Sequence, residues 1–204
     1  PYSASKAATE IVAACWRARY LQGCNVALAV CRAGNVIGGG DWSKERLIPD
    51  IVRAAMAGQI LDVRNPGAVR PWQFVLDALY GYLLLVERYW HSRAAAADPD
   101  TDAWNFGPDP GDGHVEVSQI CKWAEANWPG RFSWRIAQDN EGIEESQLLM
   151  LDPQKAFSAL GWRPKFSPQE AVRRTLDWYA HHLAGGDARE LCHGQIEHHF
   201  IGNA

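Results

Sequence analysis

The sequence predicts an α/β protein that contains the end of a doubly wound parallel sheet and, beside it, a smaller mixed α/β region. Two observations predict this class. Helical and strand-like patterns alternate along all 204 residues without an internal repeat, as they do in layered α/β domains. The run from Asn25 to Cys31 is apolar almost throughout, and strands that are apolar on both faces are typical of parallel sheets covered by helices on both sides.

The first expected element is a helix from Ser3 to about Leu21, because this stretch is rich in alanine and its apolar residues gather on one side. Gly23 ends the helix, and the Asn25–Cys31 strand follows. Residues 33–46 are expected to form a loop with three consecutive glycines. No lysine follows these glycines at the spacing of a phosphate-binding loop, so they predict a tight turn.

Apolar spacing and turn residues predict the later elements. Helices are expected over residues 47–56, 76–90, 115–128 and 168–183, and short strands over 60–63, 72–75, 103–106 and 132–136. Asp152 is a good N-cap for a further helix because Pro153 follows it. The tail after Gly185 is left without an assignment.

Composition excludes some classes of partner. The 20 Lys and Arg against 24 Asp and Glu give a formal net charge of −4, which argues against a surface for nucleic acid or anionic lipid. No apolar run approaches the roughly 20 residues of a membrane span. The five cysteines form no C-x-x-C pair, as expected of reduced thiols in a cytoplasmic protein. Because Pro1 is not an initiator methionine, we expect the chain to be part of a longer protein.

A pair of residues at the start of the first helix could carry acid–base chemistry. Tyr2 and Lys6 are four residues apart, so their side chains share one face of a helix. A tyrosine titrates near pH 10 in water, and a neighbouring ammonium lowers that pKa by stabilising the phenolate. The pair could therefore remove a hydroxyl proton while hydride leaves the same carbon. The alternative is two ordinary surface residues.

Longer motifs around this pair occur in an order that resembles a known family. The helix begins P-Y-S-A-S-K-A-A, and an apolar strand with an R-x-x-N-x-x-G loop follows it, as in the extended short-chain dehydrogenases. Further strings resemble the CDP-glucose 4,6-dehydratases within that family. These are R-A-G-N-V-I-G-G-G-D-W (32–42), R-L-I-P-D-I (46–51), R-N-P-G-A-V-R-P-W-Q (64–73), G-Y-L-L-L (81–85), W-N-F-G-P (104–108) and L-G-W-R-P (160–164).

The resemblance implies a binding site for NAD and a nucleotide sugar. Tyr2 and Lys6 would be catalytic and would also contact the cofactor, and Val36 would lie beside the nicotinamide. The other matching positions are implied substrate contacts: Asn35 as the asparagine that binds the substrate, Arg46 and Leu47 near the nucleotide, Leu61 and Val63 along the base, Arg70 at the diphosphate, and Asn105 elsewhere in the nucleotide site. A guanidinium can bind a diphosphate through two hydrogen bonds. The alternatives are a surface arginine or a bridge to Asp77 for Arg70, a turn cap for Asn35, and packing for the apolar residues.

Two other features resemble sites. Glu145 lies in an acidic run that comes near the substrate in the resembled family, where histidines are common, but a solvated loop is the better explanation of the run. The histidines at 181–182 and 193–199 lack the spacing of a metal site. We therefore predict no metal.

The resemblance further implies a Rossmann-type dinucleotide-binding domain. Residues 1–45 would be its C-terminal part, and residues 46–204 would mainly bind the nucleotide sugar, with some segments returning to the first domain. The glycine-rich dinucleotide fingerprint, the Ser or Thr partner of the tyrosine and the acid–base residues for elimination are expected upstream of Pro1. The isolated chain is therefore expected to be inactive, and to be unstable or to aggregate because apolar sheet surface is exposed.

The implied activity of the whole protein is conversion of CDP-glucose to CDP-4-keto-6-deoxyglucose. It proceeds by oxidation at C4, loss of water across C5 and C6, and return of hydride to C6. One alternative is a dehydratase or epimerase of a dTDP-, UDP- or GDP-linked sugar. Others are a non-catalytic fragment that binds a nucleotide sugar, and a pure interaction domain. The resemblance also implies a homo-oligomer.

Overall fold

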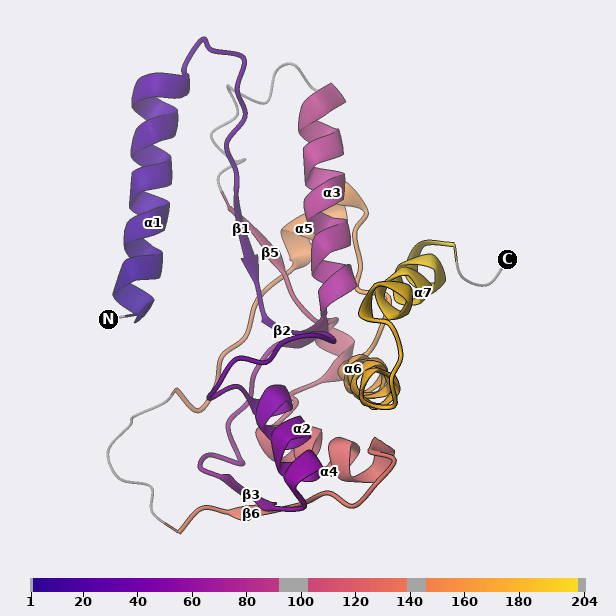
Figure 1. Ribbon diagram of the computed structural model, residues 1–204. Coiled ribbons are helices and arrows are strands. Elements are labelled where there is room, and N and C mark those ends of the chain that lie inside the picture. Colours follow the sequence, from indigo (N-terminus) through magenta and orange to yellow (C-terminus); the bar gives the residue numbers. More distant parts are fainter. Residues whose placement is uncertain (1, 92–102, 139–145, 202–204) are drawn as a thin grey trace.

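The computed structural model describes residues 2–91, 103–138 and 146–201 (Figure 1). Its elements in chain order are α1 (Tyr2–Trp16), a π-helical turn (Arg17–Leu21), β1 (Val30–Ala33), β2 (Asn35–Ile37), α2 (Leu47–Ala57), β3 (Ile60–Val63), β4 (Trp72–Phe74), α3 (Val75–His91), β5 (Ala103–Phe106), a 3-10 turn (Pro110–Asp112), α4 (Val117–Asn127), β6 (Ser133–Ile136), α5 (Gln154–Leu160), α6 (Pro168–Leu183) and α7 (Ala188–Phe200). This mixed order confirms the predicted α/β class.

The strands form three pairs, and each pair is parallel: β1 with β5, β2 with β4, and β3 with β6. In the first pair Arg32 lies opposite Asn105. In the second, Asn35 lies opposite Trp72 and Val36 opposite Gln73. Because β1 leads into β2 through a single residue, these two ladders place the ends of β1 and β5 close to β2 and β4.

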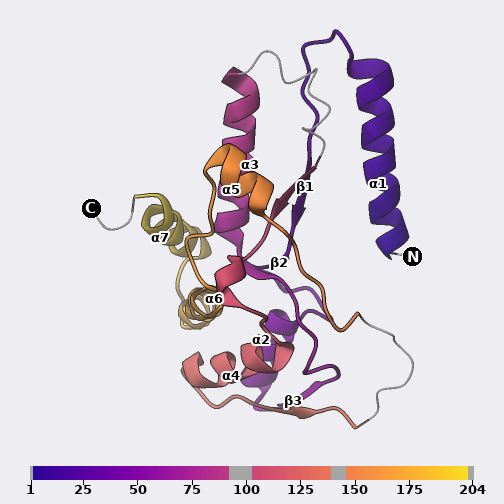
Figure 2. The same cartoon turned by 180° about the vertical axis from the view of Figure 1, so that it is seen from behind.

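Two apolar clusters hold the described residues together. One joins β1 and β5 to α3 and α5, with Leu85, Trp104, Phe106, Ala156 and Trp162 buried in it. The larger one joins α2, α4 and α6 to the other two strand pairs. Figures 1 and 2 show α3 and α5 beside the strand pair β1–β5, and α2 and α4 below it. The domain boundary expected after residue 45 stays a prediction.

The close contact of α3 with β5 depends on a glycine in the helix. An added Cβ at Gly81 would lie 2.3 Å from Cδ1 of Phe106, far inside van der Waals contact. Gly81 lies within α3, where glycine is intrinsically unfavourable. The absence of a side chain therefore allows the helix to approach the strand at this point.

The structure corrects the sequence prediction at two strands. β1 begins at Val30 rather than Asn25, because its ladder starts where β5 starts, opposite Ala103. Residues 35–37 were expected to lie in a loop but form β2. This strand has only three residues, so local sequence alone does not reveal it, and it exists through its pairing with β4.

Two helices also differ from expectation, α7 in its presence and α5 in its capping residue. The unassigned tail forms α7, whose first turn is capped by Asp187: its Oδ1 accepts hydrogen bonds from the backbone N–H groups of Arg189 and Glu190. Asp152 is not the N-cap residue of α5, since that position is Pro153. The Asp152 carboxylate still accepts the N–H of Gln154 at 2.9 Å.

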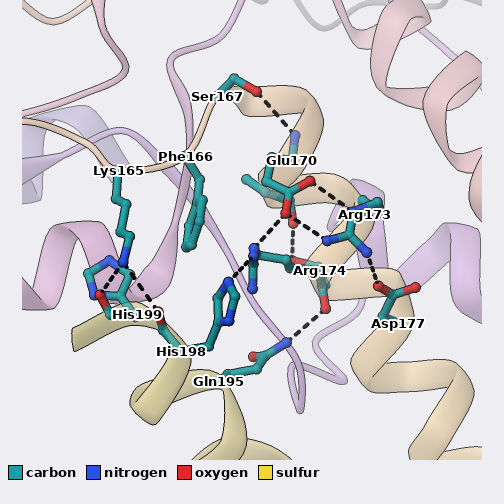
Figure 3. Close-up of polar contacts among 12 residues, drawn as sticks. Lys165, Phe166, Ser167, Glu170, Arg173, Arg174, Asp177, Gln195, His198 and His199 are labelled. Carbon is teal, nitrogen blue, oxygen red and sulfur yellow. Dashed lines mark hydrogen bonds and ion pairs between the residues drawn. The ribbon is translucent and has the colours of Figure 1, made fainter. Parts of the chain in front are cut away.

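Helix α7 is attached to α6 and to the loop before it by polar contacts (Figure 3). The guanidinium of Arg174 approaches Nε2 of His198 at 2.7 Å, and Gln195 donates to the carbonyl of Arg174 at 2.9 Å. Lys165 donates to the carbonyls of His198 and His199 at 3.2 and 2.7 Å. A lysine at these carbonyls stabilises the C-terminal end of the helix.

Helix α1 differs from the other helices because none of its residues is buried. Its apolar side chains Ile11, Val12 and Trp16 are more than half exposed. Figures 1 and 2 show it at the side of the molecule, alongside the segment that leads into β1. Within the described ranges, no helix combines the length and apolar character needed to cross a bilayer.

Candidate active site

The first turns of α1 bring Tyr2 and Lys6 together. The Nζ atom of Lys6 lies 5.6 Å from the centroid of the Tyr2 ring, so the two side chains face one another as the spacing predicts. The Tyr2 side chain is open to solvent, with 75% of the residue exposed. A phenol and an ammonium in this arrangement can share a proton-transfer role, and that role stays a prediction.

An ion pair links the same side of α1 to β1. The guanidinium of Arg32 donates from Nε to Oε1 of Glu10 at 2.7 Å, and from Nη2 to Oε2 of the same carboxylate. The hydrogen bond from Arg32 holds the pKa of Glu10 below its usual value, and the bond to Glu10 raises the pKa of Arg32. The sequence analysis assigned no role to either residue, although Arg32 is the first residue of the string 32–42 that carried the resemblance.

Asn35 and Arg70 lie on neighbouring segments of backbone. The N–H of Asn35 donates to the carbonyl of Pro71 at 2.8 Å, and Pro71 directly follows Arg70. A Cβ at Gly34 would lie 2.0 Å from that same carbonyl oxygen, so the close approach requires glycine there. The structure thus places the backbone of Asn35, implied for the substrate, beside the residue that follows Arg70, implied for the diphosphate.

The Arg70 side chain is oriented by backbone carbonyls. Its Nη1 donates to the carbonyl of Val69 at 2.9 Å and to the carbonyl of Ser146 at 2.7 Å. Ser146 follows the acidic run, and Glu145 itself lies outside the described residues. Asp77, the alternative partner considered for Arg70, accepts hydrogen bonds from Lys165 and His199.

Arg46 and Leu47 lie at the N-terminal end of α2. Arg46 is exposed and forms an ion pair with Asp41 at 3.4 Å, while Leu47 packs partly against the larger core. Burial alone would raise the pKa of Asp41, but the backbone N–H of Ser43 and the charge of Arg46 outweigh it and lower the pKa. The positive end of the α2 dipole lies at the same place, so this corner of the molecule favours an anion.

The two apolar positions implied for the base lie on β3. Val63 is buried in the larger core cluster, and Leu61 is half-buried against it. Packing therefore accounts for the Val63 side chain, as the alternative interpretation held. Leu61 retains partial exposure, so of the two it is better placed to contact a ligand.

Asn105 lies on β5, and Val36 is the middle residue of β2. The Asn105 amide donates to the carbonyl of Asp152 at 3.0 Å, and its Oδ1 is buried without a hydrogen-bond partner within the described residues. Val36 is 36% exposed. Opposite it, the fully buried Gln73 donates from Nε2 to the carbonyl of Phe106 at 2.8 Å. Gln73 thus joins the β2–β4 pair to β5, a role that its sequence context did not reveal.

None of the described residues forms a group of three or more His, Cys, Asp or Glu side chains that could hold a metal ion. The residues implied for a nucleotide sugar instead combine exposed cations, amides and a phenol. Such a set fits an anionic, hydroxyl-rich ligand.

Comparison with known proteins gives a match to a family model. Residues 1–96 match the model described as NAD dependent epimerase/dehydratase family. Its description names NAD as the cofactor, in agreement with the prediction from the sequence.

The resemblance seen in the motifs is confirmed by sequence comparison. The chain is 38% identical over 192 residues to the CDP-glucose 4,6-dehydratase of Salmonella typhimurium, an alignment that covers 92% of the chain and 52% of that protein. It is 26% identical to the dTDP-glucose 4,6-dehydratase 1 of Escherichia coli, with coverage of 88% and 47%. The chain therefore spans about half the length of the curated relatives it matches.

Solved structures support the fold. A UDP-glucose-4-epimerase from Stenotrophomonas maltophila, with bound NAD and formylated UDP-arabinopyranose, superposes with a TM-score of 0.73 at 19% identity, covering 91% of this chain and 56% of that one. A dTDP-glucose 4,6-dehydratase from Bacillus anthracis in complex with NAD gives 0.69 at 21% identity, with coverage of 88% and 51%. These likenesses confirm the predicted Rossmann-type α/β fold.

Proposed function

We propose that the whole protein containing this chain is a dehydratase that converts CDP-glucose to CDP-4-keto-6-deoxyglucose with NAD as a recycled cofactor. The observation that carries the proposal is the Tyr2–Lys6 pair at the open start of α1. The 38% identity to a CDP-glucose 4,6-dehydratase supports the choice of substrate. Homo-oligomerisation and a cytoplasmic location belong to the same proposal.

The residues present fit a nicotinamide cofactor. Tyr2 and Lys6 face one another on α1, and Val36 is partly exposed in the middle of β2. These three residues would hold the nicotinamide end. When bound, NAD supplies a reversible hydride acceptor. Tyr2 would accept the proton of the sugar 4-hydroxyl, with the ammonium of Lys6 beside its ring.

The substrate would be held by residues from α2, from strands β2, β3 and β5, and from the segment before β4. Arg70, oriented by two backbone carbonyls, and Arg46, at the positive end of α2, would bind the diphosphate. Asn35 would bind the substrate, and Asn105 would lie elsewhere in the nucleotide site. Leu61 and Leu47 would contact the nucleotide, and Val63 would support Leu61 from the core.

Replacement of the proposed base tests this function. In the whole protein, Tyr2→Phe removes the proton acceptor and keeps the ring, so we expect kcat with CDP-glucose to fall by roughly 100-fold or more. Formation of the 4-keto product is measured by its absorbance in base. Tyr20→Phe is the matched control, since Tyr20 lies on the helical turn after α1, is also exposed, and should retain full activity. Undiminished activity of Tyr2→Phe would contradict the assignment.

A second candidate is a dehydratase or epimerase for another nucleotide sugar. The relatives named as dTDP-glucose 4,6-dehydratases and the structural neighbour named as a UDP-glucose-4-epimerase favour it. Turnover of a panel of CDP-, dTDP-, UDP- and GDP-glucose separates the two candidates. Titration calorimetry of the bare chain with CDP-glucose tests the non-catalytic alternative, in which the fragment binds its ligand without turnover.

A further inference from the structure

We infer that Glu10 and Arg32 are positioning residues, which set the catalytic pair on α1 against the ligand-binding ends of β1, β2 and β5. The inference rests on the proposed function, since it concerns how that site is assembled. It adds two residues that contact neither ligand in the proposal and act through Tyr2, Lys6 and Asn35.

The placement of Glu10 ties it to the catalytic pair. Tyr2, Lys6 and Glu10 recur at intervals of four, and such residues share one side of a helix. Glu10 therefore lies one turn beyond Lys6 along the side that carries the phenol and the ammonium. Any displacement of Glu10 relative to β1 moves all three side chains together.

The placement of Arg32 ties it to the ligand-binding strands. Arg32 lies three residues before Asn35 and opposite Asn105 in the β1–β5 ladder. The backbone between Arg32 and Asn35 is fixed at Gly34, whose close approach to Pro71 leaves no room for a side chain. The ion pair thus connects α1 to a segment whose backbone is held in place by the contact of Gly34 with Pro71.

Polar contacts join α1 to β1 and to the segment before it. The helix buries none of its own residues, so within the described residues these contacts set its position relative to the strand. Another polar contact lies further along, where Nε of Arg17 donates to the carbonyl of Leu28 at 3.0 Å. Arg17 is 11 residues from Lys6, whereas Glu10 is four residues away.

The geometry of the pair suits a positioning role. Both oxygens of the carboxylate accept from one planar guanidinium, and two parallel hydrogen bonds fix orientation as well as distance. A lysine at residue 32 would keep the charge but offer a single point of contact. The substitution Arg32→Lys therefore separates orientation from charge.

The test compares Arg32→Lys and Arg32→Met with a matched pair of controls in the whole protein. Arg173 makes the same bidentate contact with Glu170 on α6 (Figure 3): its Nε and Nη2 donate to the two carboxylate oxygens at 2.8 and 2.7 Å. Its side chain is 43% exposed, equal to the 43% of Arg32. Arg173→Lys and Arg173→Met thus remove an equivalent contact that lies within a single helix.

We expect kcat to fall by roughly 10-fold in Arg32→Lys and by roughly 100-fold in Arg32→Met, because a displacement of about 1 Å can slow catalysis that much. KM should stay within about twofold, since the proposed phosphate contacts are untouched. The Arg173 variants should match the wild type. A kcat within twofold of the wild type in Arg32→Met, or an equal loss in Arg173→Met, overturns the inference.

Backbone hydrogen exchange tests the positioning without any activity. Arg32→Met should speed exchange of the α1 amides, and Arg173→Met should leave them unchanged. If the wild-type protein turns over no nucleotide sugar, the proposed function fails, and exchange alone decides whether Arg32 positions α1. Unchanged α1 exchange in Arg32→Met would then refute the inference.

Discussion

At the scale of single residues, Asp77 connects more of the molecule than the site residues do. It is 1% exposed, and its carboxylate accepts from the backbone N–H of Lys165 and from Nε2 of His199, each at 2.8 Å. Its carbonyl also accepts from the indole of Trp162 at 3.0 Å. One aspartate at the start of α3 thereby fixes the loop before α6 and the end of α7.

Asp77→Ala should destabilise the protein strongly. The change leaves buried donors without an acceptor, and breaking a buried charged network in this way costs about 3 kcal/mol. The free energy of unfolding, measured by urea denaturation, should fall by about that amount. Asp109→Ala is the control, because it removes exposed contacts to Arg163 and to the N–H of Gly111 and should cost only about 1 kcal/mol. If both variants lost the same free energy of unfolding, the burial of Asp77 would not explain its contribution to stability.

The sequence predicted some site residues better than others. Tyr2 and Lys6 could be paired from spacing alone, because helix geometry is regular. The meeting of Asn35 with Arg70 depends on Gly34 lying against Pro71, a tertiary contact between segments far apart in the chain. Gln73, Glu10 and Arg32 were missed for the same reason, since each acts through a partner on another element.

At the scale of elements, helices with clear local signals were predicted, and those that depend on tertiary contacts were not. Helix α6 has the predicted bounds, because Ser167 caps its first turn by accepting the N–H of Glu170 and Pro168 fills its first position. Helix α7 was not predicted. It contains Gly194 and few regularly spaced apolar residues, and contacts to Asp77, Lys165 and Arg174 hold it in place.

A pair of glycine replacements tests the packing of α3 on β5. Alanine favours a helix over glycine by about 1 kcal/mol, so Gly194→Ala in α7 should stabilise the protein, because nothing lies within 4 Å of the added Cβ. Gly81→Ala should destabilise it by about 1 to 3 kcal/mol, because the added carbon overlaps the Phe106 ring. Thermal and urea unfolding of both variants measure the difference. A gain in stability for Gly81→Ala would mean that α3 can move away from β5 without loss.

At the scale of the whole molecule, the 204-residue chain exposes apolar residues on several helices. On α3, Leu83 and Val86 are 60% and 63% exposed and Trp90 is 82% exposed. The apolar side of α1 is open as well. Surfaces of this kind mark places where another chain or another part of the same protein packs.

The isolated chain is therefore expected to self-associate. Light scattering coupled to size exclusion should show species larger than a monomer, or loss of soluble protein at micromolar concentration. Addition of the proposed upstream part should give a defined species, because we expect that part to cover the exposed side of α1. A monodisperse monomer of the bare chain with a cooperative melt would contradict this expectation.

The contact of Gly34 with Pro71 has a consequence for any motion during turnover. Because the N–H of Asn35 is bonded to Pro71 and Arg70 immediately precedes it, the proposed contacts of Asn35 with the substrate and of Arg70 with the diphosphate move together. The Glu10–Arg32 ion pair joins the phenol-bearing helix to the strand that leads into Asn35. Any shift of that strand during turnover would therefore carry the proton acceptor and both ligand contacts with it.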